Sequence, residues 1–285
     1  MKIAKTREEL VQKLGEIREG KSVGFVPTMG GLHAGHLSLV NRSKQSCDLT
    51  VVSVFLNPTQ FNDPNDLKTY PHNSEDDIEL LKGAGVDLVF MPTPEDMYDV
   101  GEKAPDYQIG RVAEVMEGAH RPGHFQGVVW VVSKLFRLVK PDKAFFGLKD
   151  FQQIAVIKRM IELSTDMKGL EIVSCPVIRE EDGLAMSSRN NKLSAEERAA
   201  APEIYKALQD GVEAKEKGMS IDSVHTQVVQ QINGNPLLTV EYFSIVDGDT
   251  LEEISEWQPN AVGCITVFCG DDVRLIDHIA FNGEE

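Results

Sequence analysis

Short apolar runs alternate with longer amphipathic stretches over the first 175 residues. The short runs are rich in β-branched and aromatic residues, as buried strands are, and the stretches between them repeat apolar residues at helical spacing. Strands that alternate with helices form parallel sheets, because each helix carries the chain back to begin the next strand. The predicted strands are residues 22–27, 49–55, 86–91, 144–146 and 170–174, and the predicted helices include 37–46, 128–139 and 151–163.

The pattern changes after residue 193. We expect one long helix from Ser194 and a second over residues 221–232, followed by three apolar runs with no helix between them. Consecutive strands of this kind favour a small α+β unit with an antiparallel sheet. The sequence therefore predicts an α/β fold, with a Rossmann-like parallel sheet domain over 1–178 and a smaller C-terminal α+β domain over 179–285. The last three predicted strands are residues 240–245, 261–268 and 273–279.

Charge narrows the classes of function. The 285 residues include 45 acidic and 29 basic side chains, which gives a formal charge of −16. Binding a nucleic-acid backbone takes clustered lysine and arginine, so this acidity argues against a nucleic-acid partner. Residues 194–285 carry 18 acidic side chains against 5 basic ones, so we expect an anionic ligand to bind in the first two-thirds of the chain.

Three features predict a cytoplasmic protein. No apolar run approaches the ~18 residues that a membrane helix needs, so no membrane partner is expected. The N-terminal residues lack the apolar core of a signal peptide. The four cysteines are scattered without zinc-site spacing and are expected to be reduced thiols.

The first candidate site is the glycine-rich segment 27–36, which joins a predicted strand to a helix. Helix N-termini attract phosphate, and His33 and His36 share one face of the first turn, where imidazoles could stabilise charge on phosphorus. Alone, two histidines at this spacing are more often surface side chains of a turn. The glycines and the strand–turn–helix setting favour the phosphate site, and a metal site is less favoured because no third ligand follows.

Two further segments carry phosphate-binding side chains. Lys149 and Gln153 follow another predicted strand, and Ser187, Ser188 and Arg189 lie in a loop near the domain boundary. A lysine at such a turn suits a phosphate, and hydroxyls with a guanidinium suit a clamp that closes over a nucleotide. Alone, the first segment is equally consistent with a lysine that extends to solvent and a solvated glutamine, and a Ser-Ser-Arg tripeptide by itself is more often an ordinary loop.

In combination, these motifs resemble the nucleotidyltransferase superfamily, whose signatures are a His-x-Gly-His turn and a later Lys-Met-Ser-Lys-Ser loop. Within it the chain resembles the pantothenate synthetase (pantoate–β-alanine ligase) family over essentially its whole length. That resemblance implies ATP-dependent ligation of pantoate and β-alanine, with pantoyl adenylate as the intermediate and Mg²⁺ accompanying ATP. The matching stretches are residues 27–36, 52–61, 69–72, 121–128, 145–153 and 182–190.

The resemblance also implies a role for each matching residue. His33, His36, Lys149 and Arg189 would be catalytic, and Gln60 and Gln153 would bind pantoate. Asp76 and Asp77 fall where magnesium-binding carboxylates have been proposed, although both also suit a plain helix N-terminus. The residues implied in ATP binding are Met29, Gly30, Gly31, Leu32, His33, Ala34, Gly35, His36, Gly147, Leu148, Lys149, Asp150, Ile178, Met186, Ser187, Ser188 and Arg189.

One position departs from the family pattern, because Leu148 stands where the family usually has glutamate. A side-chain polar role is lost there, while backbone contacts and Lys149 are retained. The resemblance further implies a homodimer and a C-terminal domain that acts as a lid, hinged near residues 176–179. Two alternatives stay open: a nucleotidylyltransferase of the same superfamily with no amine step, and a non-catalytic nucleotide-binding protein.

Overall fold

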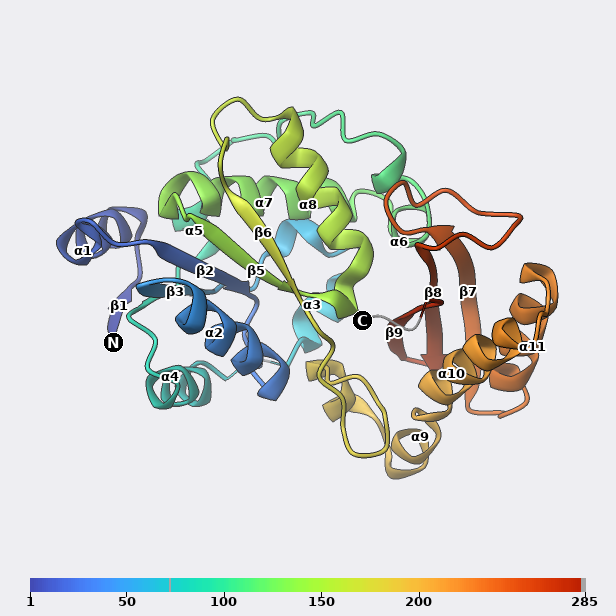
Figure 1. The fold of residues 1–285 in the computed structure, drawn as a ribbon. Coiled ribbons are helices and arrows are strands. Elements are labelled where there is room, and N and C mark those ends of the chain that lie inside the picture. The colour runs from blue at the N-terminus through green and yellow to red at the C-terminus, as the bar shows by residue number, and fades with distance from the viewer. Residues whose placement is uncertain (72, 283–285) are drawn as a thin grey trace. The chain divides into compact units, whose positions relative to one another are not determined.

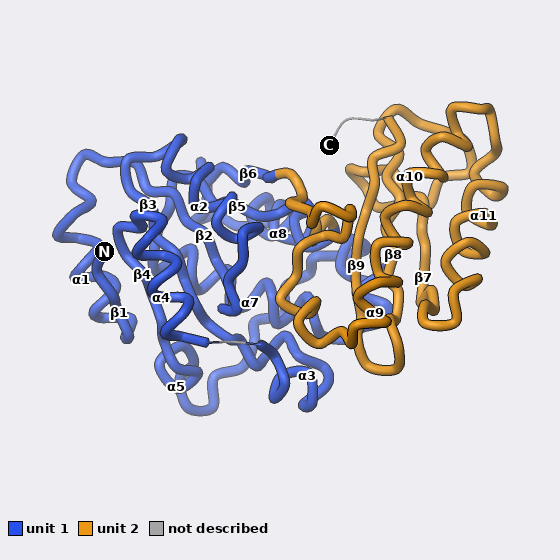
Figure 2. Tube along the Cα trace, turned by 90° about the horizontal axis from the view of Figure 1, so that it is seen from below, with its two compact units in different colours: residues 1–148, 152–175 blue, residues 149–151, 176–285 orange. Residues whose placement is uncertain are grey.

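The computed structural model describes residues 1–71 and 73–282. The chain forms two compact units, residues 1–148 with 152–175 and residues 149–151 with 176–285 (Figure 2). Each unit is described separately below. The stretch 69–72, which contributed to the family resemblance, ends at His72, which lies outside the described residues.

A six-stranded, all-parallel sheet forms the centre of the first unit (Figure 1). Its strand order is β1-β4-β3-β2-β5-β6. Five of these strands are predicted from the sequence, and the three-residue β1, which pairs with β4 at the sheet edge, is not. The strands are β1 (Lys2–Ala4), β2 (Val23–Thr28), β3 (Leu49–Val54), β4 (Leu88–Phe90), β5 (Lys143–Gly147) and β6 (Glu171–Cys175).

Helices connect these strands, and several of them begin at a polar N-cap residue. The N-cap of α1 is Thr6, whose side chain accepts a hydrogen bond from the Glu9 amide at 3.2 Å, while the Glu9 carboxylate accepts from the Lys5 amide. The helices are α1 (Arg7–Arg18), α2 (Ala34–Ser46), α3 (Pro64–Thr69), α4 (Ser74–Gly83), α5 (Pro94–Met97), α6 (Glu117–His120), α7 (His124–Val139) and α8 (Phe151–Leu163), with 3₁₀ turns η1 (Pro58–Gln60), η2 (Arg111–Ala113) and η3 (Leu148–Asp150).

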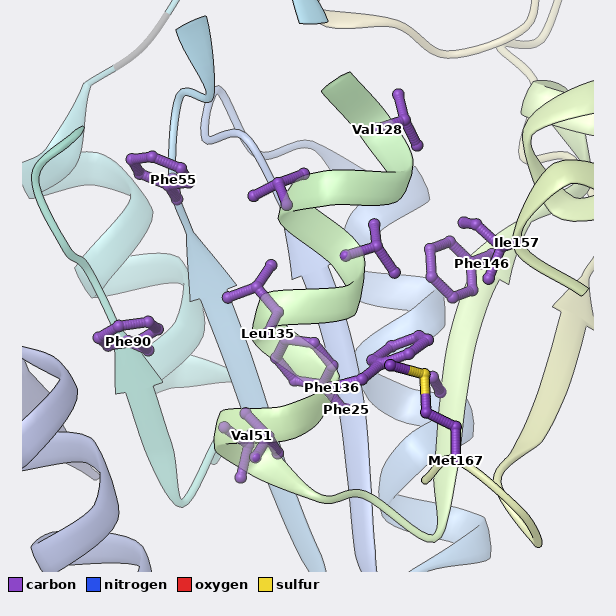
Figure 3. Packing of buried hydrophobic residues seen from close by; sticks show 14 of the residues in the cluster. Phe25, Val51, Phe55, Phe90, Val128, Leu135, Phe136, Phe146, Ile157 and Met167 are labelled. Atoms are coloured by element: carbon purple, nitrogen blue, oxygen red, sulfur yellow. The ribbon is translucent and has the colours of Figure 1, made fainter. Parts of the chain in front are cut away.

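Alternating side chains bury both faces of the parallel sheet. Phe25 and Val51 point to the face covered by α1, α7 and α8, and their neighbours Val26 and Val52 point to the face covered by α2 and α4. Figure 3 shows the first of these cores, where Phe136 of α7 lies over the strands. Both faces of the sheet are packed against apolar layers, so the loops that leave the carboxyl ends of its strands start from fixed positions.

The second unit contains a three-stranded antiparallel sheet and helices packed against one of its faces. Its strands pair in the order β7-β8-β9 and are antiparallel, so the predicted antiparallel sheet and the α/β fold class with a small α+β part are confirmed. The elements are η4 (Ser188–Lys192), α9 (Ala195–Ala200), α10 (Glu203–Glu216), α11 (Ile221–Asn233), β7 (Leu238–Asp247), β8 (Ala261–Cys269) and β9 (Val273–Ala280).

The single long helix expected from Ser194 is wrong. The chain instead forms α9 and α10, separated at Pro202, which has no amide proton to continue the hydrogen-bond ladder of α9. Ser194 does begin α9 with a capping box that includes Glu197. Among the described residues, none of the helices combines the length and the apolar character of a membrane span.

Candidate active site

The carboxyl end of β2 is the point where the sheet changes its direction of growth. From β2 the chain adds β3 and β4 on one side, and it then returns to add β5 and β6 on the other. Ligands of open α/β sheets bind in the crevice at such a switch point. Residues 29–33 leave β2 at this position and lead into α2, so the predicted phosphate turn occupies the expected place.

Hydrogen bonds from distant residues hold this turn. The Thr28 hydroxyl donates to the Ser53 carbonyl at 2.7 Å, which joins the ends of β2 and β3. Gly30 and Gly31 have φ of 87° and 65°, a region that side chains disfavour. The buried Asp77 carboxylate of α4 accepts hydrogen bonds from the amides of Gly31 at 3.1 Å and Leu32 at 2.8 Å. The turn is therefore fixed before any ligand binds.

The two histidines form a capping pair at the start of α2. His33 is the N-cap, and its Nδ1 accepts a hydrogen bond from the Gly35 amide at 3.2 Å. The Nδ1 of His36 accepts from the His33 amide at 3.3 Å, and the ring centroids lie 4.2 Å apart. A neutral imidazole that accepts at Nδ1 carries its proton on Nε2. Each ring is thus prepared to donate from Nε2 at the positive end of the helix.

Gln60 lies buried in the turn η1 after β3. Its Oε1 accepts from Asn57 Nδ2 at 2.9 Å, and its Nε2 lies 3.2 Å from the Met29 sulfur. The buried Asn57 in turn accepts from the Tyr98 hydroxyl at 2.7 Å. Burial raises the pKa of Tyr98 to about 12, so this hydroxyl stays protonated and remains a donor. The structure thus brings together Met29 and Gln60, two of the residues predicted from the sequence.

The start of helix α7 contacts the backbone of Gln60. His124 Nδ1 donates to the Gln60 carbonyl at 2.8 Å, and its Nε2 lies 3.2 Å from Arg121 Nη1. Arg121 also lies 3.6 Å from the Glu117 carboxylate. Gly127 lies so close that a Cβ atom there would be 2.2 Å from the Thr59 carbonyl oxygen. The stretch 121–128 pointed to this loop and to Arg121 and His124 as supporting side chains, whereas sequence reasoning missed Glu117 and the close approach of Gly127.

At the end of β5, two adjacent glutamines have different environments. Gln152 is buried and structural, because its amide donates to the carbonyls of Val112 and Val115 and its Oε1 accepts from the Glu117 amide. Gln153, the predicted substrate ligand, is half-buried beside it on α8. Leu148 packs against the apolar core of the first unit, which accounts for a leucine at this position.

Gly147 ends β5 in the first unit, whereas Lys149, Asp150, Ile178 and residues 186–189 belong to the second unit. Lys149 Nζ lies 3.7 Å from the Asp150 carboxylate. The Met186 amide donates to the Ile178 carbonyl at 2.9 Å, which closes a hairpin before residues 187–189. Ser187 caps η4 by accepting from the Arg189 amide at 3.2 Å.

The two candidate magnesium ligands contact the protein itself. Asp77 is committed to the turn after β2, and Asp76 accepts from Asn73 Nδ2 at 2.7 Å. Over residues 1–71 and 73–282, no group of three or more His, Cys, Asp or Glu side chains is arranged to hold a metal ion. Both carboxylates are therefore engaged in hydrogen bonds within the protein.

Comparison with known proteins gives a consistent family. Residues 2–280 match the family described as pantoate-beta-alanine ligase. A pantothenate synthetase of Porphyromonas gingivalis strain W83 is 53% identical over 270 residues, which is 92% of each chain. The crystal structure of pantothenate synthetase from Thermus thermophilus superimposes with a TM-score of 0.92 at 41% identity, covering 99% of each chain. The Francisella tularensis pantoate-beta-alanine ligase, complexed with beta-gamma ATP and beta-alanine, gives a TM-score of 0.81 at 31% identity, covering 100% of this chain and 99% of that one.

Proposed function

Because the chain belongs to the pantoate–β-alanine ligase family, we propose that it joins pantoate to β-alanine at the expense of ATP, forming pantothenate, AMP and pyrophosphate. The main structural support for this assignment is that the turn after β2 and the turn after β3 are in contact at the carboxyl ends of these strands. Gln60 of the turn after β3 contacts Met29 of the phosphate turn after β2, so a carboxylate ligand and a nucleotide phosphate would lie side by side.

The reaction has two halves. A carboxylate oxygen of pantoate attacks the α-phosphorus of ATP, the bond to the β-phosphate oxygen breaks, and pyrophosphate leaves. The amine of β-alanine then attacks the activated carbonyl carbon and loses a proton, the bond from that carbon to the bridging oxygen breaks, and AMP leaves with this oxygen. Neither half needs a covalent enzyme intermediate, because positioning and charge stabilisation carry most of the catalysis of such transfers.

Each half relies on side chains whose orientation the fold sets. The Nε2 protons of His33 and His36 donate to phosphate oxygens where negative charge grows on phosphorus. The amide of Gln60 binds pantoate without adding a competing charge, and Gln153 adds a second amide. Lys149 and residues 186–189 bind the phosphates of ATP, with Gly147, Asp150 and Ile178 as further nucleotide contacts.

Several finer assignments are part of the proposal. The protein works in the cytoplasm as a homodimer, and magnesium enters with ATP. Residues 1–178 form the catalytic domain and residues 179–285 form the lid. Light scattering of the purified protein tests the dimer. The four cysteines are free thiols, which supports the cytoplasmic location because disulfides are rare there.

Pyrophosphate and AMP release test the function directly. Purified protein is given MgATP and pantoate, with and without β-alanine. Pantoate-dependent pyrophosphate release, with AMP freed in turnover only when β-alanine is present, establishes the ligase. Pyrophosphate release without pantoate would favour the nucleotidylyltransferase alternative, and ATP binding without turnover would favour the non-catalytic one.

His36→Ala tests the phosphate turn. Loss of its ring removes a donor to the phosphates, so we expect pyrophosphate release to fall by about 10²–10³-fold. Circular dichroism should show an unchanged fold. A near-wild-type rate of pyrophosphate release would contradict this role of His36.

A further inference from the structure

Two neighbouring residues of β9, Asp277 and His278, carry buried polar groups outside the proposed catalytic set. They are 6% and 3% exposed. Successive side chains of a strand point to opposite faces, so Asp277 lies on the face covered by α10 and His278 lies on the other. A buried carboxylate is costly unless it is hydrogen-bonded, whereas the Nδ1 atom of the buried His278 has no hydrogen-bond partner among the described residues and its ring is held by stacking. Each of the two residues contacts a different segment of the second unit.

The partner of Asp277 is Arg179. The guanidinium donates two parallel hydrogen bonds to the carboxylate, Nη1 to Oδ2 at 2.7 Å and Nη2 to Oδ1 at 3.0 Å. Nη1 also donates to the Gly183 carbonyl at 3.2 Å, and the guanidinium carbon lies 3.4 Å from the centre of the Tyr205 ring. A two-pronged arrangement of this kind fixes orientation as well as distance. Asp277 therefore holds Arg179 in one geometry.

Arg179 begins the hairpin that leads to residues 186–189. Arg179 and Ala185 form an antiparallel bridge, and the Met186 amide donates to the Ile178 carbonyl at 2.9 Å. The bond from Arg179 to Gly183 closes the tip of the same hairpin. Anchoring Arg179 to β9 therefore sets the position from which residues 186–189 depart.

The partner of His278 is Phe151. The two rings are stacked, with centroids 5.3 Å apart and planes at 24°. Burial lowers the pKa of His278 to about 4, so the ring is neutral and stacks as an aromatic at physiological pH. Phe151 directly follows Lys149 and Asp150 and belongs with them to the second unit. The stack therefore ties residues 149–150 to β9.

We propose that Asp277 and His278 are positioning residues that set the spacing between residues 149–150 and residues 186–189. The proposal rests on the proposed function, which assigns both segments to ATP. The strand β9 holds both segments, because its adjacent residues Asp277 and His278 contact them from opposite faces of the sheet. ATP phosphates offer oxygens at fixed separations, so a change in this spacing weakens nucleotide binding more than it weakens pantoate binding.

Asp277→Asn tests the first anchor. Asparagine keeps the size of the side chain but turns an amide NH₂ or a single neutral oxygen towards the guanidinium, so the two-pronged contact is lost. We expect KM for ATP to rise about tenfold, with KM for pantoate within about twofold of wild type. Glu241→Gln is the matched control, because Glu241 of β7 forms a half-buried ion pair with Arg274, which lies on β9 like Asp277. It should leave both KM values unchanged, even if it lowers Tm.

His278→Ala tests the second anchor and serves if Asp277→Asn fails to fold. Alanine removes the stacked ring, so KM for ATP should rise several-fold, by about three- to tenfold. His278→Phe restores a ring and should return KM to the wild-type value. A merely structural role would lower Tm in these variants without selectively changing KM for ATP.

Binding of a non-hydrolysable ATP analogue, followed by calorimetry, separates the two proposals. If wild type binds the analogue but does not turn over pantoate, the proposed function fails, and weaker binding by the variants still supports the anchors. If wild type turns over pantoate while folded Asp277→Asn and His278→Ala bind the analogue as wild type does, the positioning proposal is overturned.

Discussion

Gly127→Ala perturbs the proposed pantoate side of the site without replacing a proposed substrate ligand. The added Cβ would lie 2.2 Å from the Thr59 carbonyl oxygen and 2.7 Å from the Gln60 Cα. Ordinary contacts of a Cβ atom begin near 3.4 Å, so α7 or the turn η1 must move by about 1 Å. His124 and Asn57 join α7 to this turn, so the shift is transmitted to Gln60.

The expected loss of activity exceeds the loss of stability. A misplacement of about 1 Å in a substrate-positioning group can cost about 10²-fold in rate. Overpacking should cost about 1–3 kcal/mol of unfolding free energy, partly offset by the gain of up to about 1 kcal/mol from replacing a helical glycine. We therefore expect pantoate-dependent pyrophosphate release to fall about 100-fold at saturating ATP, in a protein that remains folded.

Gly15→Ala is the matched control. Gly15 is also helical, in α1, but a Cβ there would meet nothing within 4 Å beyond its chain neighbours and the nearby backbone of its own helix. It should raise the unfolding free energy by about 0.5–1 kcal/mol and leave the rate unchanged. The assay is coupled pyrophosphate detection, with thermal unfolding to confirm the fold. Wild-type kcat/KM for pantoate in Gly127→Ala would refute the argument that this close approach positions Gln60.

Two further predictions concern stability. Asp77→Asn weakens the charge-assisted hydrogen bonds to the amides of Gly31 and Leu32 and should lower the free energy of unfolding by about 1.5–3 kcal/mol in guanidinium titrations. The control Asp76→Asn should change it by less than about 0.5 kcal/mol. Equal effects of the two substitutions would contradict the role of Asp77 in holding the turn. Folding lowers the pKa of His278 from 6.5 to about 4, so between these values the unfolded chain binds a proton that the folded chain does not. The contribution of His278 to the free energy of unfolding is therefore fully present above pH 6.5 and is lost as the pH falls towards 4. Wild type should therefore lose about 2 kcal/mol more than His278→Phe between pH 7 and pH 5, and parallel pH curves would contradict this.

Regular elements were well predicted where the local pattern determines them. The helix over 151–163 has the predicted bounds, and the antiparallel strands of the second unit lie where apolar runs are. The strand β1 escaped notice because three residues give no periodicity, and its pairing with β4 is what defines it. The helix expected from Ser194 was predicted too long because the amphipathic pattern continues across Pro202.

The supporting contacts of the site could not be predicted from the sequence. Asp77 looked like a residue of a helix N-terminus, and its role follows from contacts to amides 45 and 46 residues away. Likewise His278 had no partner identifiable in the sequence, because Phe151 is distant along the chain. Such contacts depend on tertiary geometry, whereas the phosphate turn itself follows from a local strand–glycine–helix pattern.

The second unit is assembled from two separate parts of the chain. Residues 149–151 belong to it, although residues 152–175 return to the first unit before the chain enters 176–285. A fragment expressed from residue 176 onward would therefore lack Phe151 and would leave the imidazole face of His278 open to water. Recombination at a single junction near residue 176 would transfer an incomplete module. Exchange between relatives should succeed only when the tripeptide 149–151 and the C-terminal part come from the same parent.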